Sequence, residues 1–427
     1  MGPSEAVGVI RAEDSEAVTR QHWKWSVLAG MASYLDAGSI VALGSGLALF
    51  QAYLGLSSAA VGALAAIGPN ALGCAVGAFV GGRLGDKLGR KRIYKYDLLV
   101  YAAGILLIML AVDAPMLFAG TFVVGVAVGV DVPTSLALVG EFSPSKARGK
   151  LVSFTQIAWN SGPVVVLLLA LALSSLNLLG IRIVFGMLFV VAIVTWALRR
   201  GIAESARWQT ASAGPIVHRV RALFRGPNLQ ALLWTTTIYL FWNLAAGTSG
   251  IFTPFIIKTL HAGSQAASVA LSCAGFVIGI LFTLPFMRLV DRGHRARHVM
   301  WAAGAVMQVV AYVAFLVLPF TIPVIIVNIV LFGAGSAFAG EAVYKIFSQE
   351  LFPTMLRATA QGFTFGAART VLGIWSFFVP VLASTGIRPV AAFLTAALLI
   401  SGITGFLFMP NTAGKPLEQI EAERAAV

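Results

Sequence analysis

The chain has few charged residues and almost no cysteine. Only 11% of its 427 residues are Asp, Glu, Lys or Arg, whereas 58% are hydrophobic, and the mean hydropathy is +0.87. A soluble protein needs far more charge to cover its surface, so this composition excludes a large soluble domain and places most of the chain in lipid. Cys74 and Cys273 both lie inside apolar segments, which excludes a framework of disulfide bonds.

The sequence also lacks the motifs of catalysis and of nucleotide hydrolysis. It contains no phosphate-binding G-x-x-x-x-G-K-[ST] motif, so ATP hydrolysis is not expected to drive the protein. The five histidines show no spacing typical of metal ligands. We therefore predict that the chain is not an enzyme and has no metal and no cofactor. An ion gradient, most simply of protons, is the expected energy source.

Apolar segments of about 20 residues recur along the whole chain, each long enough to cross a bilayer as a helix. We predict an all-α integral membrane protein with twelve transmembrane helices in two pseudo-symmetric six-helix bundles. The predicted spans are 25–50, 57–81, 94–113, 115–139, 150–174, 178–199, 229–257, 266–287, 299–319, 322–346, 359–384 and 388–409. The predicted divisions are a cytoplasmic N-terminal arm (1–24), a six-helix bundle (25–199), a cytoplasmic linker (200–228), a second six-helix bundle (229–409) and a cytoplasmic tail (410–427).

The formal net charge of +13 lies in short runs of basic residues between the apolar segments. Every second connection carries almost no basic residue, and this alternation is the positive-inside pattern of membrane proteins. It predicts a multi-pass protein of the cell's inner (plasma) membrane with both termini in the cytoplasm. A nucleic-acid-binding surface would need aromatic residues among these charges on a soluble face, so we expect no nucleic acid. The expected partners are the lipid bilayer and a small-molecule solute, with the chain acting as a monomer.

Two charged motifs occur at matching places in both halves of the chain. Asp86 and Asp291 follow the second apolar segment of their halves, each two residues after a leucine and at the start of a basic loop. A second motif has a glutamate followed by a proline and an arginine at equal spacing. Duplicated halves with a solute site at their junction are how many transporters are built. The members of the second motif are Glu141, Pro144 and Arg148 in the first half, and Glu350, Pro353 and Arg357 in the second.

The loop from Gly82 to Arg92 reads GRLGDKLGRKR and resembles the G-x-L-x-D-x-x-G-R-[KR] loop of the major facilitator superfamily. Within that superfamily the chain resembles the sugar porters, and among them the bacterial inositol transporters, at residues 141–156, 204–208 and 350–357. The resemblance implies a proton-coupled symporter of a small polyhydroxylated solute, such as inositol or a monosaccharide, working by alternating access. It also implies that charges at the inner surface bridge the halves when the inner gate is shut. These gate residues are Arg83, Asp86, Arg90, Glu141, Arg148, Glu204, Arg207, Asp291, Glu350 and Arg357.

The sequence departs from the sugar porters at several positions that bear on the solute. Where the family has Gln-Gln and Tyr-Tyr pairs in the seventh helix, this chain has Phe241–Trp242 and Ile251–Phe252. Lys345 replaces the tenth-helix tryptophan that stacks on sugar, and Arg369 lies in the eleventh helix, where the repeat register places it opposite Asn160. Because arginine pairs well with carboxylate and sulfonate groups, an organic anion or acidic sugar held by Lys345 and Arg369 is the alternative solute.

Two aspartates lie inside predicted spans, where an ionised side chain is costly. Asp36 occupies the position of the first-helix proton-binding aspartate of the sugar porters, so we predict that it couples protons to transport. The alternative is a structural hydrogen bond between helices. The arginine that partners this aspartate in sugar porters is replaced here by Thr121. Asp131 is predicted either to share the proton-coupling role or to form a buried pair with Arg369 or Lys345.

Amide, phenol and tryptophan side chains inside the spans are predicted to bind the solute. Amides and phenols both donate and accept hydrogen bonds, as a hydroxyl-rich solute requires, and tryptophan rings suit the apolar face of a sugar. The alternative for each tryptophan is packing against lipid or the core. Glu341 and Lys345 stand four residues apart and either bind the solute or neutralise each other. The predicted solute-binding residues are Gln156, Trp159, Asn160, Tyr239, Trp242, Asn243, Glu341, Lys345 and Arg369.

Overall fold

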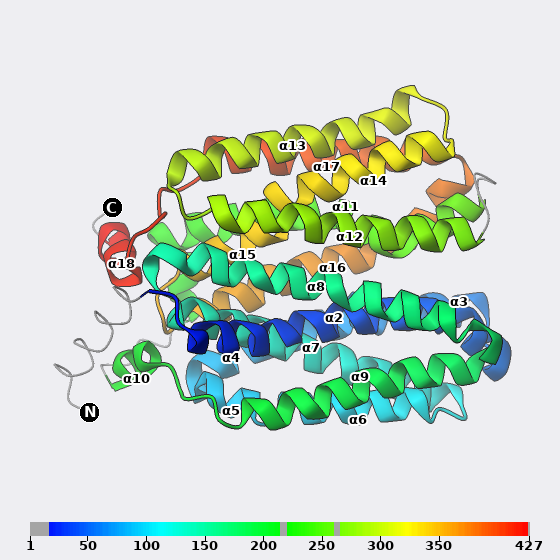
Figure 1. Ribbon diagram of the computed structural model, residues 1–427, viewed down its shortest axis with the longest axis horizontal. Coiled ribbons are helices and arrows are strands. Elements are labelled where there is room, and N and C mark those ends of the chain that lie inside the picture. The colour runs from blue at the N-terminus through cyan, green and yellow to red at the C-terminus, as the bar shows by residue number, and fades with distance from the viewer. Residues whose placement is uncertain (1–16, 214–219, 260–264, 426–427) are drawn as a thin grey trace.

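The computed structural model describes residues 17–213, 220–259 and 265–425, which form helices joined by short loops, with no β-strand among them (Figure 1). The N-terminal half contains α2 (Arg20–Leu54), α3 (Ser58–Ile67), α4 (Leu72–Leu88), α5 (Arg90–Tyr94), α6 (Asp97–Met109), α7 (Ala114–Phe142), α8 (Arg148–Ala172) and α9 (Leu178–Arg199). The C-terminal half contains α11 (Gly226–Thr259), α12 (Gln265–Leu289), α13 (His294–Val317), α14 (Ile322–Phe338), α15 (Glu341–Glu350), α16 (Arg357–Ser384) and α17 (Ile387–Leu407).

Ten segments of the described chain are long and apolar enough to cross a membrane. Two of these segments consist of two helices each, α3 with α4 and α14 with α15. Helices α6, with 13 residues, and α11, with 34, fall outside the ten and overlap the predicted spans 94–113 and 229–257. The prediction of an all-helical membrane fold is confirmed.

Two of the spans are broken near their middle, which the apolar pattern does not predict. Helix α3 ends at Ile67 and α4 begins at Leu72, whereas α14 ends at Phe338 and α15 begins at Glu341. In the second break Gly340 lies against an indole ring so closely that a Cβ atom at this position would overlap it. The breaks interrupt the apolar surface and introduce polar residues at mid-span.

Helices of the N-terminal half pack mainly on one another, and so do those of the C-terminal half. Helix α2 packs against α8, α4 against α7, and α6 against α7 and α9, whereas α13 packs against α14 and α17, and α11 against α16 and α17. The halves meet chiefly where α16 lies on α4 and α12 lies on α8. In Figure 1 the start of α2 and helix α18 (Leu417–Ala425) lie at the same end of the molecule, which we call the terminal end.

Glycines let α4 and α16 approach closely between the halves. A Cβ atom at Gly82 would overlap the carbonyl oxygen of Ala358, and one at Gly362 would overlap that of Ala78. We expect Gly82→Ala and Gly362→Ala each to weaken this contact by about 1–3 kcal/mol, because the backbone must move to admit a methyl group. The apparent Tm in detergent should fall in both variants but not in Gly62→Ala, where a Cβ atom meets open space. An unchanged Tm in the first two variants would contradict the prediction.

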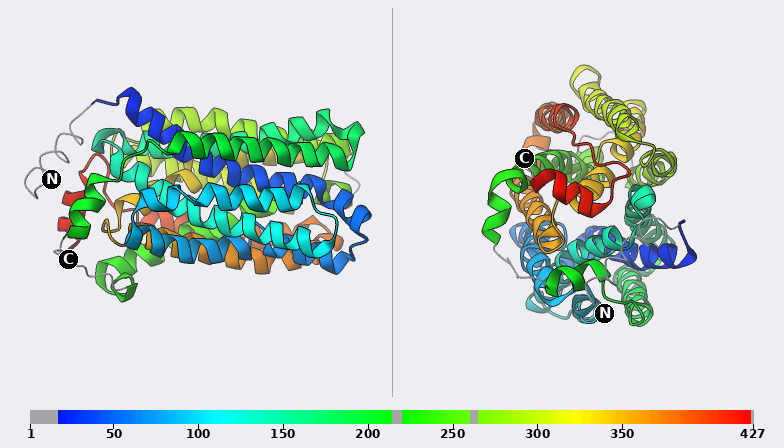
Figure 2. Two further views of the ribbon diagram at one scale, coloured as in Figure 1. Left: turned by 90° about the horizontal axis from the view of Figure 1, so that it is seen from below. Right: turned by 90° about the vertical axis from the view of Figure 1, so that its left-hand side faces the viewer.

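The C-terminal tail is less exposed than the sequence predicts. Residues 410–427 were expected to be solvated, yet α18 docks on the molecule with Leu417 and Ile420 buried. Its Glu418 pairs at 2.8 Å with Arg207 of α10 (Ala206–Ala213) in the linker between the halves. The end-on view in Figure 2 shows α18 lying across the terminal end. Leu417 and Ile420 are three residues apart and therefore share one helix face, which explains the docking.

Candidate functional site

A buried ion pair joins the two halves deep in the molecule. Arg369 Nη2 on α16 lies 3.3 Å from Asp36 Oδ2 on α2, and both side chains are at most 3% exposed. The Trp159 indole on α8 donates to the same aspartate oxygen at 3.1 Å, and Arg369 Nη1 donates to Asn70 Oδ1 at 2.7 Å. Asp36 Oδ1 is buried and receives no hydrogen bond from the described residues. The pair therefore spans the two halves and leaves one carboxylate oxygen without a donor.

A second ion pair lies on α15. Lys345 Nζ is 3.3 Å from Glu341 Oε1 and donates to Gln156 Oε1 on α8 at 3.0 Å. Both charged side chains are buried, as are those of Asp36 and Arg369. Two carboxylates and two cations sum to zero charge, and this balance makes four ionised groups tolerable in an interior of low dielectric constant. We call Asp36, Glu341, Lys345 and Arg369 the central cluster.

A cavity of about 110 Å³ lies between the halves, with walls from α8 on one side and α11, α12 and α14 on the other. A smaller cavity of about 30 Å³ shares Trp159 and Trp242 with it and is also lined by Asn70, Glu341 and Arg369. The central cluster therefore adjoins the space in which a solute can bind. The polar and aromatic residues that line the larger cavity include Gln156, Trp159, Asn160, Trp242, Ser249, Phe276, Asn328, Phe332 and Ser336.

The structure brings most of the predicted solute-binding residues to the walls of these two cavities. Lys345 reaches them through its hydrogen bond to Gln156. Tyr239 lies in neither wall, because its ring stacks on Tyr344, with 3.9 Å between centroids, and on Phe365, with 5.7 Å. The predicted residues in the walls are Gln156, Trp159, Asn160 and Trp242 in the larger cavity, and Trp159, Trp242, Asn243, Glu341 and Arg369 in the smaller.

Several polar residues of the site were missed by sequence reasoning. Asn70 lies in the break between α3 and α4, where it accepts a hydrogen bond from Arg369. Asn328 and Ser336 on α14, and Ser249 on α11, line the larger cavity. An amide or hydroxyl inside an apolar span was a sufficient signal to nominate each of them. The apolar pattern does not reveal which face of its helix such a residue occupies.

Asp131 lies outside the central cluster, and the predicted pairing with Arg369 or Lys345 is wrong. Its carboxylate binds Arg199 Nη1 on α9 at 2.9 and 3.1 Å. Asp97 on α6 lies 3.6 Å from the same nitrogen. This partner was not expected, because Arg199 stands in a basic run that the positive-inside pattern already explains.

At the terminal end, two aspartates each meet the start of a helix in the opposite half. Asp86, near the end of α4, accepts the backbone N–H groups of Ala358 and Thr359 in the first turn of α16, at 3.2 and 2.7 Å. Asp291, after α12, accepts two N–H groups in the first turn of α8, at 3.0 and 2.8 Å. A carboxylate is favoured at a helix N-terminus, where N–H groups are unpaired and the dipole is positive. The repeated sequence motif thus forms two equivalent contacts.

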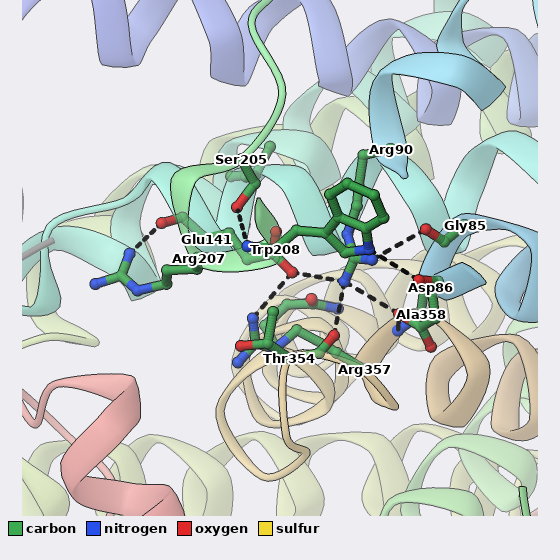
Figure 3. Close-up of polar contacts among 12 residues, drawn as sticks. Gly85, Asp86, Arg90, Glu141, Ser205, Arg207, Trp208, Thr354, Arg357 and Ala358 are labelled. Carbon is green, nitrogen blue, oxygen red and sulfur yellow. Dashed lines mark hydrogen bonds and ion pairs between the residues drawn. The ribbon is translucent and has the colours of Figure 1, made fainter. Parts of the chain in front are cut away.

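Glu141, near the end of α7, holds two arginines, as Figure 3 shows. Its Oε1 accepts from Arg90 Nη2 at 2.7 Å and from Arg357 Nη1 at 3.1 Å. Arg90 also pairs with Asp86 at 3.0 Å and donates to the carbonyl oxygen of Thr354 at 2.8 Å. The four charged side chains are buried. Glu141 and Arg90 therefore connect the N-terminal half directly to the start of α16.

Glu350 occupies the equivalent position in the C-terminal half. Arg297 on α13 donates to both of its oxygens at 2.7 and 3.2 Å and pairs with Asp291 at 3.6 Å. Arg148, at the start of α8, lies 3.8 Å from Glu350 across the halves. Arg297 was not among the predicted gate residues, and equal spacing does not find it, because it stands six residues after Asp291 whereas Arg90 stands four after Asp86. We call Asp86, Arg90, Glu141, Arg148, Asp291, Arg297, Glu350 and Arg357 the inter-half network.

Three predicted gate residues stand outside the inter-half network. Arg83 is exposed on α4 and forms no ion pair with any residue that the structure describes. Glu204, in the linker, accepts two backbone N–H groups at the start of α5, each at 3.1 Å, and so connects the linker to the N-terminal half. Arg207 pairs with Glu418 of α18, and its guanidinium also donates to the carbonyl oxygen of Glu141. Arg207 therefore links the linker helix to the tail and to α7.

Comparison with known proteins identifies the family. Residues 26–380 match the model of the Major Facilitator Superfamily. The chain belongs to the major facilitator superfamily. It is 39% identical over 412 residues to the minor myo-inositol transporter IolF of Bacillus subtilis, covering 94% of this chain and 93% of IolF. It is 25% identical to the glucose transporter GlcP of Staphylococcus epidermidis, over 82% of this chain and 86% of GlcP.

Solved structures of other transporters have the same fold. The proton:xylose symporter XylE, bound to 6-bromo-6-deoxy-D-glucose, matches with a TM-score of 0.79 at 19% identity, covering 94% of this chain and 99% of XylE. The human organic anion transporter MFSD10 matches with a TM-score of 0.70 at 13% identity, covering 90% and 99%. The predicted superfamily and the resemblance to bacterial inositol transporters are confirmed. The chain is a multi-pass membrane transporter and not an enzyme.

Asp291 gives this member of the superfamily a pH-dependent contact at the terminal end. Burial raises the pKa of its carboxyl group to about 6, and Glu350 adds to the rise, although Arg297 and the accepted N–H groups lower it. If the halves separate at this end, water surrounds Asp291 and its pKa returns to about 4. The joined arrangement then binds the proton more tightly. It is favoured as pH falls from about 6 to about 4, and this advantage is lost as pH rises through 6.

We expect the ratio of joined to separated molecules to rise about tenfold or more between pH 7 and pH 4.5. Spin labels on cysteines introduced at Lys87 and Arg295, which are exposed in opposite halves, report this ratio as a distance distribution. Asp291→Asn should flatten the pH dependence, because the amide does not titrate. A variant that keeps the full dependence would assign it to another group.

Proposed function

We propose that this chain is a proton-coupled symporter of a small polyhydroxylated solute, such as inositol or a monosaccharide, working by alternating access. One observation carries the proposal: the Asp36–Arg369 pair bridges the halves beside a cavity lined by amides, hydroxyls and tryptophans. The sequence identity with the minor myo-inositol transporter IolF supports the solute class.

The cavity wall suits a neutral solute that is rich in hydroxyl groups. Each hydroxyl both donates and accepts hydrogen bonds, and the side-chain amides of Gln156, Asn160 and Asn328 offer both functions. Trp159 and Trp242 provide aromatic rings for the C–H face of a sugar or cyclitol. Because Trp159 also donates to the Asp36 carboxylate, a solute packed on its ring would contact a side chain that is hydrogen-bonded to the proposed proton site.

Asp36 is the group that we propose to couple proton and solute movement. In its ionised form it attracts Arg369 of the opposite half, and in its protonated form this attraction is lost. Since Asp36 Oδ1 receives no hydrogen bond from any described residue, a proton can bind there without displacing one of these donors. A proton that weakens a contact between the halves shifts the equilibrium between their arrangements, which is what alternating access requires.

An organic anion or acidic sugar bound by Lys345 and Arg369 is the alternative solute. The charge balance of the central cluster supports a neutral solute instead, because Glu341 and Asp36 already compensate both cations. We expect neutral polyols to compete with labelled myo-inositol and carboxylated or sulfonated analogues to compete poorly. Stronger competition by the anionic analogues, together with a selective loss of their transport in Lys345→Gln, would favour the alternative.

We also propose twelve membrane-crossing helices in two pseudo-symmetric six-helix bundles. The ten long apolar segments supply ten of them, and α6 and α11 are the other two. The equivalent contacts of Asp86 and Asp291 support the internal symmetry. The basic loops support a cytoplasmic terminal end, with both termini in the cytoplasm and the chain in the plasma membrane. One copy holds the whole cavity and the central cluster, which supports a functional monomer driven by a proton gradient without a cofactor.

Uptake by the purified protein in proteoliposomes tests the proposal. Labelled myo-inositol or glucose is supplied with an inside-alkaline pH gradient, without a gradient, and with a protonophore. We expect accumulation above the outside concentration only with the gradient, and alkalinisation of an unbuffered medium when unlabelled solute is added. Failure to transport any polyol or monosaccharide would refute the solute class, whereas accumulation that ignores the gradient would refute the coupling.

A further inference from the structure

A second cluster of buried charges lies within the N-terminal half. Arg199, at the end of α9, binds both oxygens of Asp131 on α7 at 2.9 and 3.1 Å. The same nitrogen lies 3.6 Å from Asp97 Oδ2 at the start of α6. All three side chains are at most 4% exposed. We call Asp97, Asp131 and Arg199 the acid triad, and none of them lines either cavity.

The acid triad has one negative charge too many. Two ionised carboxylates and one guanidinium sum to −1, and no second cation contacts them among the described residues. The groups that face the triad are neutral: α2 supplies the carbonyl oxygen of Leu28, α5 the ring of Tyr94, and α7 the hydroxyl of Ser135. An uncompensated charge in a low-dielectric interior is strongly unfavourable, so the cluster is most stable when it holds one proton.

The hydrogen bonds indicate which carboxyl group holds the proton. Both oxygens of Asp131 act as hydrogen-bond acceptors, because both bind Arg199 and the Ser135 hydroxyl also donates to one of them. Asp97 Oδ1 accepts the adjacent backbone N–H of Leu98 at 2.6 Å, whereas its Oδ2 is buried and receives no hydrogen bond from the part of the chain that the structure describes. Oδ2 of Asp97 and both oxygens of Asp131 lie within 3.6 Å of the same Arg199 nitrogen, so the two carboxyl groups are neighbours. A proton on Asp97 Oδ2 would turn this unsatisfied acceptor into a donor to Asp131.

We propose that Asp97 and Asp131 form a proton-sharing pair in which Asp97 is a neutral carboxylic acid at neutral pH. The acid donates to Asp131, whose negative charge Arg199 balances, so the triad becomes electrically neutral. Two carboxylates that face one cationic nitrogen in a low-dielectric site do not both ionise readily. This proton site joins α6, α7 and α9 of one half, whereas Asp36 bridges the two halves. It therefore requires no assumption about the solute.

Infrared spectroscopy of the full-length protein tests the proposal, because a neutral carboxylic acid has a C=O stretching band that carboxylates lack and that shifts in D₂O. Asp97→Asn should remove this band and keep the apparent Tm within about 2 °C of the parent, since the amide still donates to Asp131. Asp131→Asn should lower the apparent Tm by about 5 °C or more, because Arg199 loses its bidentate charged partner. Uptake by Asp97→Asn should remain within about twofold of the parent.

Two further variants keep the assignment unambiguous. Asp113→Asn changes an exposed carboxylate that caps α7, and it should leave the infrared band in place. Asp36→Asn distinguishes the triad from the proposed coupling site, because a band that disappears only in this variant belongs to Asp36. An unchanged band in Asp97→Asn, or a Tm loss as large as that of Asp131→Asn, would overturn the proposal. Neither readout depends on transport, so failure of every uptake assay leaves this test intact.

Discussion

Replacing Asp36 with asparagine is expected to abolish the accumulation of solute against its gradient. Asparagine keeps the shape of the side chain and an oxygen that accepts from the Trp159 indole, but it cannot take up or release a proton. A carrier without this step cannot draw on the proton gradient, so the solute only equilibrates across the membrane. Steady-state uptake in proteoliposomes with an imposed pH gradient measures the loss, and solute counterflow without a gradient measures the exchange that remains.

The loss of charge at Asp36 also affects the central cluster. Arg369 would keep Asn70 as a hydrogen-bond partner but lose its carboxylate, leaving the cluster with one excess positive charge. Breaking a buried pair by removing one partner costs about 3–5 kcal/mol, so we expect exchange by Asp36→Asn to slow as well. The double variant Asp36→Asn/Arg369→Gln restores a neutral cluster. It should exchange solute faster than the single variant while still failing to accumulate it.

Asp113→Asn is the matched control, because the same chemical change occurs at an exposed helix cap. It should accumulate solute like the parent. Accumulation retained by Asp36→Asn would falsify the coupling role and direct attention to Glu341, the other carboxylate of the central cluster. A double variant that exchanges no better than the single one would show that Arg369 acts through its contact with Asn70 rather than through its charge.

The sequence pointed best to residues in the repeated motifs and to pairs within a single helix. Asp86 was predicted as a gate residue that bridges the halves, and the structure places it at the start of α16 in the opposite half. The duplicated glutamates Glu141 and Glu350 each hold arginines at the terminal end, as the repeat suggested. Glu341 and Lys345 pair within α15 at the four-residue spacing read from the sequence. Local spacing determines the Glu341–Lys345 pair, whereas the repeated motifs marked the residues of the other contacts without giving their partners.

The contacts that the sequence did not predict depend on how helices rotate and break. The repeat register places Arg369 opposite Asn160, but this arginine binds Asp36 and Asn70 instead. The break between α3 and α4 positions Asn70 there, and no feature of the apolar run marks that break. Arg199 likewise became a buried partner, because the end of α9 packs inside its half. Depth and rotation follow from packing between helices, which a single sequence does not specify.

Glu141→Gln is expected to open the terminal end of the transporter. The carboxylate accepts from Arg90 and Arg357 through one oxygen, and all three side chains are almost fully buried. Arg357 would then lose its carboxylate hydrogen-bond acceptor, and Arg90 would keep Asp86 as its ion-pair partner. Removing one partner from a buried ionic cluster costs about 3–5 kcal/mol, which shifts the equilibrium away from the joined arrangement by roughly two to four orders of magnitude.

The penalty applies only while the halves are joined, and this makes the variant a conformational probe rather than a simple loss of stability. Once the halves separate, water solvates Arg90 and Arg357, so the missing carboxylate no longer matters. Spin labels at positions 87 and 295 should therefore report a longer distance in Glu141→Gln than in the parent. Glu423→Gln removes an exposed carboxylate that pairs with Lys415, and it should leave the distance unchanged, because exposed pairs contribute little. Equal distances in both variants would mean that the other contacts between the halves, such as those of Asp86 and Asp291 with helix N-termini and of Arg90 with the Thr354 carbonyl, keep this end joined without Glu141.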